Sequence, residues 1–131
     1  VREAGLCDAS GWVPVDPRTL LTADARVHAV GDVCAVPLPG AGLLPKAGIL
    51  AERQGLVVAH NLLAALDGAA ERREFDGVGH CFFEVGAREA MLVEGAFFVP
   101  PGDRVRFSPA STETYALKQQ FERERLSRWF D

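Results

Sequence analysis

Three places in the sequence carry residue types that can bind a ligand or take part in redox chemistry, and the first is Gly31 with Asp32. A glycine at the end of a strand lets a ligand approach the backbone closely, and the adjacent carboxylate can accept hydrogen bonds from sugar-like hydroxyl groups. An ordinary Gly-Asp turn has the same sequence. The dipeptide alone therefore leaves both interpretations open.

The second place is the start of a long helical pattern, at Lys46, Ala47 and Gly48. The first amide groups of a helix and its positive dipole end favour an anionic ligand atom, and the lysine would add a full positive charge. A solvated lysine at a helix start is the alternative. This segment indicates an anion site only if other groups converge on it.

The third place is Cys81, in the apolar run 80–85. A cysteine in such a run serves either as a small core residue or as a redox-active thiol. A dithiol cycle needs a second thiol, and nothing in the spacing brings Cys7 or Cys34 to Cys81. If Cys81 is redox-active, we expect its partner to lie outside this chain.

The cysteines and histidines do not have the spacing of metal ligands, so we predict no metal site. Three widely spaced cysteines also do not form a disulfide framework. Free thiols are typical of a reducing compartment. We therefore expect a cytoplasmic protein.

The elements that would position Gly31 and Lys46 lie in the first half of the chain. We expect strands at 11–15 and 26–30, an Asp-Pro turn at 16–19 and an irregular loop at 37–42. A helix is predicted from about Pro45 to Leu66, ended by Asp67 and Gly68. Its apolar residues occur on several sides, so it needs more cover than this chain supplies.

After a charged linker at 69–74, the second half has the pattern of a small α+β domain. Strands at 80–85 and 90–99 are joined by 86–89, which is typical of a hairpin. Period two places Cys81, Phe83 and Val85 on one face and His80, Phe82 and Glu84 on the other. A last helix is predicted over 112–130, capped by Ser111 or Thr112. It has apolar residues on two sides, so it packs on its own sheet or also meets a partner or a membrane surface.

Length, composition and charge limit the classes of protein to which this chain can belong. The chain has 131 residues, of which 48% are hydrophobic and 24% are charged, enough for one domain or two small pieces. No apolar run approaches the length of about 18 residues that spans a membrane. A net charge of -4 argues against nucleic acid as a partner. The sequence begins at Val1 with no pattern of a signal peptide, so we expect a piece of a longer protein.

Taken together in order, these motifs resemble those of the pyridine nucleotide-disulfide oxidoreductase superfamily. The segment 22–32 resembles its second FAD-contacting motif, and 45–55 resembles the helix that points its start at the flavin in sulfide:quinone oxidoreductases and type II NADH dehydrogenases. The segments 80–86 and 92–98 resemble the carboxy-terminal hairpin of the sulfide:quinone oxidoreductase and flavocytochrome c sulfide dehydrogenase branch. The segment 117–130 resembles its closing helix.

The resemblance implies roles for individual residues. Asp32 would accept a hydrogen bond from the ribitol chain of FAD, and Gly31 would allow the approach. Lys46, Ala47 and Gly48 would place the start of the helix near the pyrimidine edge of the flavin, where it stabilises negative charge. In the sulfide-oxidising members a cysteine at the position of Cys81 works with one from an earlier part of the protein. Phe82 and Phe83 would then lie near a quinone pocket or pack in the core.

One departure from the family is large, because no Gly-x-Gly-x-x-Gly occurs and the phosphate-binding half of an FAD site is missing. The predicted fold class is an α/β fragment, the end of an FAD/NAD(P)-binding domain (1–66), followed by a small α+β carboxy-terminal domain with an antiparallel hairpin and a terminal helix (67–131). FAD is expected in the full-length parent. The isolated chain should bind it poorly or not at all and have no activity.

The predicted function is that of the carboxy-terminal portion of an FAD-dependent oxidoreductase that passes electrons from sulfide or NAD(P)H through flavin to a quinone-like acceptor. The alternatives are a type II NADH dehydrogenase and a non-catalytic dimerisation or interaction module. The expected partners are the remaining FAD/NAD(P)-binding part of the parent, a quinone, further copies of the chain in a homo-oligomer, and the membrane surface as a peripheral contact.

Overall fold

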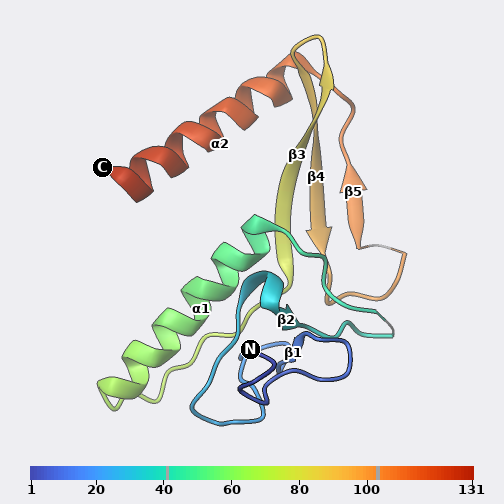
Figure 1. Cartoon of the computed structure of the whole chain (residues 1–131). Helices are drawn as coiled ribbons and strands as arrows, with labels where there is room; N and C mark the ends of the chain where they lie inside the picture. The colour runs from blue at the N-terminus through green and yellow to red at the C-terminus, as the bar shows by residue number, and fades with distance from the viewer. Residues whose placement is uncertain (41, 103) are drawn as a thin grey trace. The chain divides into compact units, whose positions relative to one another are not determined.

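A computed structural model describes residues 1–40, 42–102 and 104–131 (Figure 1). The elements in chain order are β1 (Val13–Pro14), the 3-10 turn η1 (Gly31–Val33), β2 (Cys34–Ala35), α1 (Gly48–Leu66), β3 (Val78–Gly86), β4 (Glu89–Ala96), β5 (Val105–Phe107) and α2 (Thr112–Phe130). The chain forms two compact units. The first contains Val1–Gly79 and Ala96–Arg104, and the second contains His80–Gly95 and Val105–Asp131.

The core of the first unit lies around a short parallel pair of strands. β1 and β2 pair with Val13 opposite Cys34, and Leu20, Val36 and Phe75 are buried with them. The predicted turn at 16–19 is confirmed, because the Asp16 carboxylate accepts hydrogen bonds from the backbone of the two residues that follow the proline. This turn brings the chain back toward the core.

The strand predicted over 26–30 is wrong. The described chain there makes one isolated antiparallel bridge, between Leu21 and His28. Local hydrogen bonds explain the difference: the Thr22 amide donates to the Val27 carbonyl, and the Val27 amide donates to the Asp24 carbonyl. These bonds close a tight turn in place of an extended segment. Consequently Gly31 and Asp32 do not end a strand but form the turn η1 that leads into β2.

The helix α1 ends at the predicted place and begins later than expected. Gly68, just after the C-cap residue Asp67, has a φ of +70°, a conformation that glycine adopts freely. The start differs by three residues from the expected one, because Ala47 is extended and Gly48 is the first helical residue. Pro45 therefore precedes the helix.

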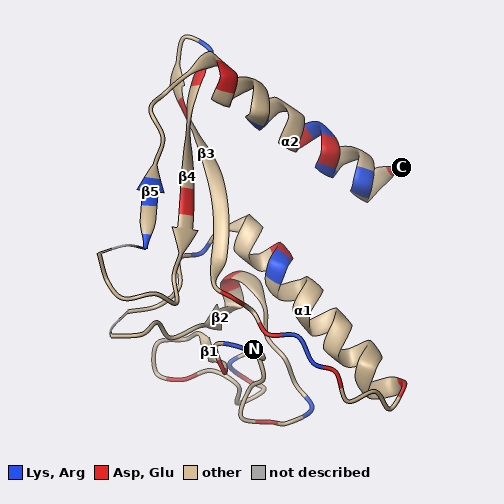
Figure 2. Cartoon of the chain, turned by 180° about the vertical axis from the view of Figure 1, so that it is seen from behind, with Lys and Arg blue, Asp and Glu red and all other residues tan. Residues whose placement is uncertain are grey.

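The buried stripe of α1 is not the one that hydrophobicity suggests. Leu50, Gln54, Asn61 and Ala64 are buried, whereas the leucines from the middle of the helix to its end are about half exposed or more; these are Leu56, Leu62, Leu63 and Leu66. Figure 2 shows that the second half of α1 carries no charged residue. The exposed side of this half is therefore apolar and uncharged.

The charged linker after α1 is anchored to the helix. The Asn61 side chain donates to the Arg73 carbonyl at 2.9 Å and accepts from the Arg73 amide at 2.8 Å. Two residues further on, the Phe75 amide donates to the Arg18 carbonyl at 2.8 Å. These bonds hold the linker against α1 and the turn at 16–19. They also place the buried Phe75 ring in the core of the first unit.

The second unit is a three-stranded sheet, in the order β3-β4-β5, with one helix. The predicted hairpin is confirmed: Ala87 and Arg88 both have positive φ angles, of 50° and 59°, as the type I′ turn of a two-residue hairpin requires. The strand β5 was not predicted. It pairs antiparallel with β4, with Val93 opposite Phe107.

The terminal helix α2 has the predicted bounds and begins beside the hairpin (Figure 1). The Ser111 hydroxyl accepts a hydrogen bond from the Thr114 amide, and Ser111 bridges to Ala90. The helix meets the face of β3 that carries His80 and Phe82: Phe121 packs edge-on against both rings. Beyond this contact its last turns are exposed, with Phe130 79% exposed.

Among the described residues, no helix is long and apolar enough to cross a membrane. The antiparallel sheet and terminal helix agree with the predicted α+β part of the fold. The predicted division into a segment of an FAD-binding domain (1–66) and a carboxy-terminal domain (67–131) refers to a parent protein and stays a prediction.

Candidate functional site

A small hollow in the first unit brings together residues that the sequence singled out separately. Gly31 and Asp32, from η1, and Lys46 and Ala47, from the approach to α1, all line it. Its volume is about 10 Å³, enough for roughly one water molecule. The fifth predicted cofactor-binding residue, Gly48, does not line the hollow and is the first residue of α1.

Gly31 is required by the way that η1 packs against α1. Its φ is +73°, and a Cβ atom at this position would lie 3.2 Å from the Cβ atom of Ala51. The Gly31 amide donates a hydrogen bond of 2.6 Å to Oε1 of Gln54. The turn is thus pressed onto one face of the helix, and the next residue, Asp32, is exposed at the edge of the hollow.

The start of α1 is open. Its N-cap residue, Ala47, offers no side-chain hydrogen bond, and the first turn contains no acidic residue. A Cβ atom at Gly48 would meet nothing within 4 Å. The first amides of any helix have no carbonyl partner within it. This helix start can therefore accept an anionic or oxygen-bearing group, in contrast to α2, whose start is capped by Ser111.

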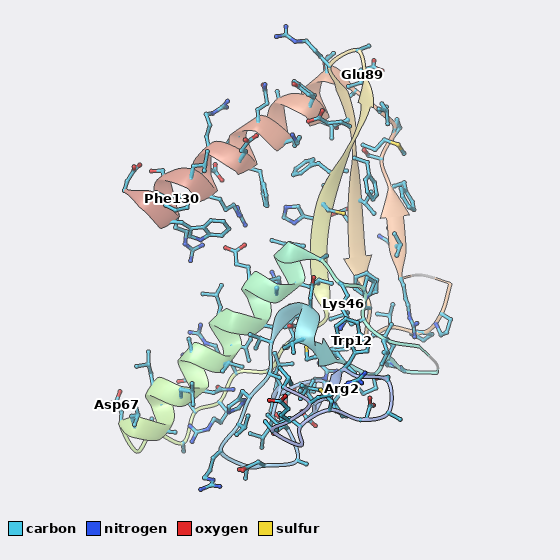
Figure 3. All side chains as sticks on the ribbon, viewed as in Figure 1. Arg2, Trp12, Lys46, Asp67, Glu89 and Phe130 are labelled. Carbon is cyan, nitrogen blue, oxygen red and sulfur yellow. The ribbon has the colours of Figure 1, made fainter. Side chains whose placement is uncertain are left out.

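The ammonium group of Lys46 is held beside the hollow. Nζ donates to the carbonyl oxygen of Cys34 and lies 4.5 Å from the centre of the Trp12 ring. Figure 3 shows the two side chains next to each other. A cation over an indole ring is electrostatically favoured. The ammonium group of Lys46 therefore has two partners in the first unit, while the residue as a whole is exposed.

Cys34 lies behind η1 and has a structural role. It is 1% exposed, and its Sγ donates to the Gly31 carbonyl at 3.0 Å. Burial raises the pKa of the Cys34 thiol above its ordinary value, so the sulfur stays protonated and unreactive at neutral pH. Sequence reasoning did not single out its neighbour Gln54. The available signal was a glutamine spaced four residues from Leu50 and seven from Asn61 on one helix face.

Cys81 lies in the second unit, on β3. It is partly exposed and is a free thiol, like Cys7 and Cys34, which belong to the first unit. Alternation along β3 places it on the side opposite His80 and Phe82. No described cysteine forms a disulfide with it.

A larger depression, which we call the aromatic groove, lies between α2 and the sheet of the second unit. Its volume is about 340 Å³, and its lining includes His80, Phe82, Glu94, Leu117, Phe121 and Arg125. The rings of Phe82 and Phe121 are 5.7 Å apart, and the Arg125 guanidinium lies 3.8 Å from the centre of the Phe121 ring. Such a lining suits a flat, mostly apolar molecule with polar groups at its edge. Phe83 is on the other face of the sheet.

Metal binding has no support in the described part of the chain, where no cluster of His, Cys, Asp and Glu side chains could hold an ion. His28, the histidine nearest to η1 in sequence, has its Nδ1 atom 3.1 Å from the Thr19 carbonyl oxygen. This contact accounts for its half-buried position as a packing residue.

The fold defined by these elements is a mixed α/β arrangement with a three-stranded antiparallel sheet and a terminal helix. No family model matches the sequence. The structure is similar to that of the sulfide:quinone oxidoreductase from the hyperthermophilic bacterium Aquifex aeolicus, with a TM-score of 0.75 and 21% sequence identity. The match covers 94% of this chain and 29% of that chain. The resemblance that the motifs indicated is thus confirmed at the level of the fold.

Proposed function

We propose that this chain is the carboxy-terminal portion of an FAD-dependent oxidoreductase that passes electrons from sulfide or NAD(P)H through flavin to a quinone-like acceptor. The observation that carries the proposal is the convergence of Gly31, Asp32, Lys46 and Ala47 on one hollow. These residues come from two segments of the chain, and each segment alone has an ordinary structural explanation. The similarity in fold to a sulfide:quinone oxidoreductase supports the same proposal.

The residues around the hollow have the chemistry that would suit part of an FAD molecule. FAD supplies two-electron transfer chemistry when bound. The exposed Asp32 carboxylate is available to accept a hydrogen bond from a ribitol hydroxyl, and the open start of α1 can place backbone amides against the flavin ring. The positive charge of Lys46 adds positive potential to the same region. The pyrophosphate must be held elsewhere, by a glycine-rich segment of the remaining FAD-binding part.

Cys81 is the proposed redox-active thiol of the sulfide reaction. It is partly exposed, unlike Cys34, whose buried thiol has a raised pKa. A reactive thiol must be accessible to its reactants. Its partner thiol would come from another part of the parent protein. A parent of the type II NADH dehydrogenase kind would take its electrons from NADH and would not need Cys81.

The aromatic groove is the proposed site on the acceptor side. Phe82 and Phe121 offer aromatic surfaces to a flat ring, and His80 offers a polar group for one of its oxygen atoms. The volume of about 340 Å³ lies within the usual range for small-molecule sites, about 300–1,000 Å³. A quinone-like headgroup has this chemistry.

The exposed apolar surfaces are the proposed contacts with partners. The leucines on the outer side of α1 would pack against the remaining FAD/NAD(P)-binding part of the parent or against a second copy of the chain. The exposed aromatic end of α2, with Trp129 and Phe130, would touch the membrane surface. The same surfaces favour the second candidate function, a non-catalytic interaction or dimerisation module that keeps the fold without flavin.

The test uses the protein encoded by the full reading frame that includes this chain. We expect it to purify with a flavin absorbance. Asp32→Ala should weaken FAD binding by about 10- to 100-fold, because a hydrogen bond to a charged group contributes about 1.5–3 kcal/mol. Asp67→Ala is the matched control, since that exposed carboxylate belongs to the same unit, follows the far end of α1 and does not line the hollow.

The outcomes separate the candidate functions. A protein without flavin, or an Asp32→Ala variant with unchanged FAD affinity, contradicts the oxidoreductase proposal and leaves the interaction module. Cys81→Ser should abolish flavin reduction by sulfide and leave FAD binding intact. If sulfide still reduces the flavin in that variant, Cys81 is a packing residue.

A further inference from the structure

We infer that Gln54 is a positioning residue for the cofactor, because its buried amide holds the turn η1 in the conformation that presents Asp32 at the edge of the hollow. The inference rests on the proposed FAD site and adds a residue that does not need to touch the flavin. Gln54 acts through the backbone of Gly31.

The first observation is the burial of a polar side chain in the middle of α1. Gln54 is 2% exposed, and a buried amide is costly unless its atoms form hydrogen bonds. Its Oε1 accepts from the Gly31 amide at 2.6 Å and lies 3.8 Å from the Sγ atom of Cys34. One side-chain oxygen therefore contacts the first residue of η1 and the residue that directly follows this turn.

The second observation is that η1 is held on α1 by close packing and hydrogen bonds at Gly31. Gly31 has a φ of +73°, and its α-carbon faces Ala51, which is three residues before Gln54 on the same side of α1. The Gly31 carbonyl accepts from the Cys34 amide and from its thiol, so both polar backbone groups of Gly31 are engaged. Asp32 follows directly, and its direction depends on this arrangement.

The third observation is that a second buried amide on the same helix stripe provides a comparison. Asn61 is 7% exposed and makes two hydrogen bonds to the backbone of Arg73. It anchors the linker after α1, as Gln54 anchors η1, but it lines no part of the hollow. Loss of Asn61 therefore measures the structural cost of removing a buried anchor from this helix.

The experiment compares Gln54→Leu with Asn61→Leu in the protein of the full reading frame. FAD affinity is measured by fluorescence titration of the apoprotein, and the visible circular dichroism of the bound flavin reports its surroundings. Thermal unfolding of the apoprotein measures the structural cost of each change. We expect both variants to unfold at lower temperature, but only Gln54→Leu to weaken FAD binding, by about tenfold, and to change the flavin dichroism.

A conservative variant separates positioning from packing. Gln54→Glu keeps an oxygen that accepts from the Gly31 amide, so its FAD affinity should stay within about threefold of the wild type. A larger loss contradicts the inference, and this comparison stands even if Gln54→Leu does not fold. Equal FAD affinities for Gln54→Leu and Asn61→Leu also contradict it. If the wild-type protein binds no FAD, the proposed function fails and the inference fails with it.

Discussion

Replacement of Gly31 by alanine should destabilise the first unit by about 2–5 kcal/mol, the sum of two separate costs. A φ of +73° costs an alanine about 1–2 kcal/mol. The new Cβ atom would also lie 3.2 Å from that of Ala51, inside the optimum separation of about 3.5–4.0 Å. Overpacking of this kind typically costs about 1–3 kcal/mol.

A matched control isolates the cost of the close contact with Ala51. Gly68 has nearly the same backbone conformation, with a φ of +70°, but a Cβ atom there would meet nothing within 4 Å. Gly68→Ala should therefore cost only about 1–2 kcal/mol. In a double-mutant cycle, adding Ala51→Gly to Gly31→Ala should remove the close contact between the two Cβ atoms. The two substitutions should therefore show a coupling energy of about 1–3 kcal/mol.

The assay is urea unfolding followed by fluorescence. Trp12 belongs to the first unit and Trp129 to the second, so a Trp129→Phe background leaves Trp12 as the single reporter. With a slope of about 1–3 kcal/mol per M of urea, Gly31→Ala should lower the midpoint by roughly 1 M more than Gly68→Ala does. Equal shifts in the two variants, or no coupling to Ala51, would refute the close packing of η1 on α1.

Two further predictions follow from the titration behaviour of single groups. Hydrogen bonds from the backbone amide and hydroxyl of Thr19 hold the pKa of Asp16 below its ordinary value; the stabilisation is therefore present above the unfolded pKa of about 4 and lost as pH falls through the folded pKa. Urea unfolding from pH 6 to 3 should show a shallower loss for Asp16→Asn, and parallel curves would contradict this origin. Burial raises the pKa of Cys34, so iodoacetamide should label it at least about tenfold more slowly than Cys81 in the folded protein. Comparable rates, measured by mass spectrometry of the peptides, would mean that Cys34 is accessible.

Features that depend on neighbours in sequence were predictable from the sequence. The hairpin turn at Ala87 and Arg88, the end of α1 at Asp67 and the cap of α2 at Ser111 each follow from residues within about four positions. The alternation along β3 also predicted that His80 and Phe82 share one face, because side chains of a strand have a period of two, but it did not predict that this face meets α2. The motif order indicated the fold that the comparison with sulfide:quinone oxidoreductase supports.

Other elements were missed because local hydrogen bonds or distant pairing decided them. Residues 26–30 have strand-forming side chains, but the hydrogen bonds between Thr22, Asp24 and Val27 close a turn there. The strand β5 has three residues and is defined by its pairing with β4. A segment this short has too few side chains to show a pattern of its own.

The sequence by itself determined that α1 exists and roughly where it lies, while tertiary structure decided which side of it is buried. Hydrophobicity favours the leucines, yet two amide side chains, those of Gln54 and Asn61, face the core. Their partners are the backbones of Gly31 and Arg73, which lie 23 and 12 residues away along the chain. The helical periodicity of a sequence depends only on the side chains of the helix itself. These amides are buried because the fold brings backbone groups that need hydrogen-bond partners next to them. The hydrogen bond between the Gly31 amide and Gln54 also holds the turn that presents Asp32 at the edge of the hollow.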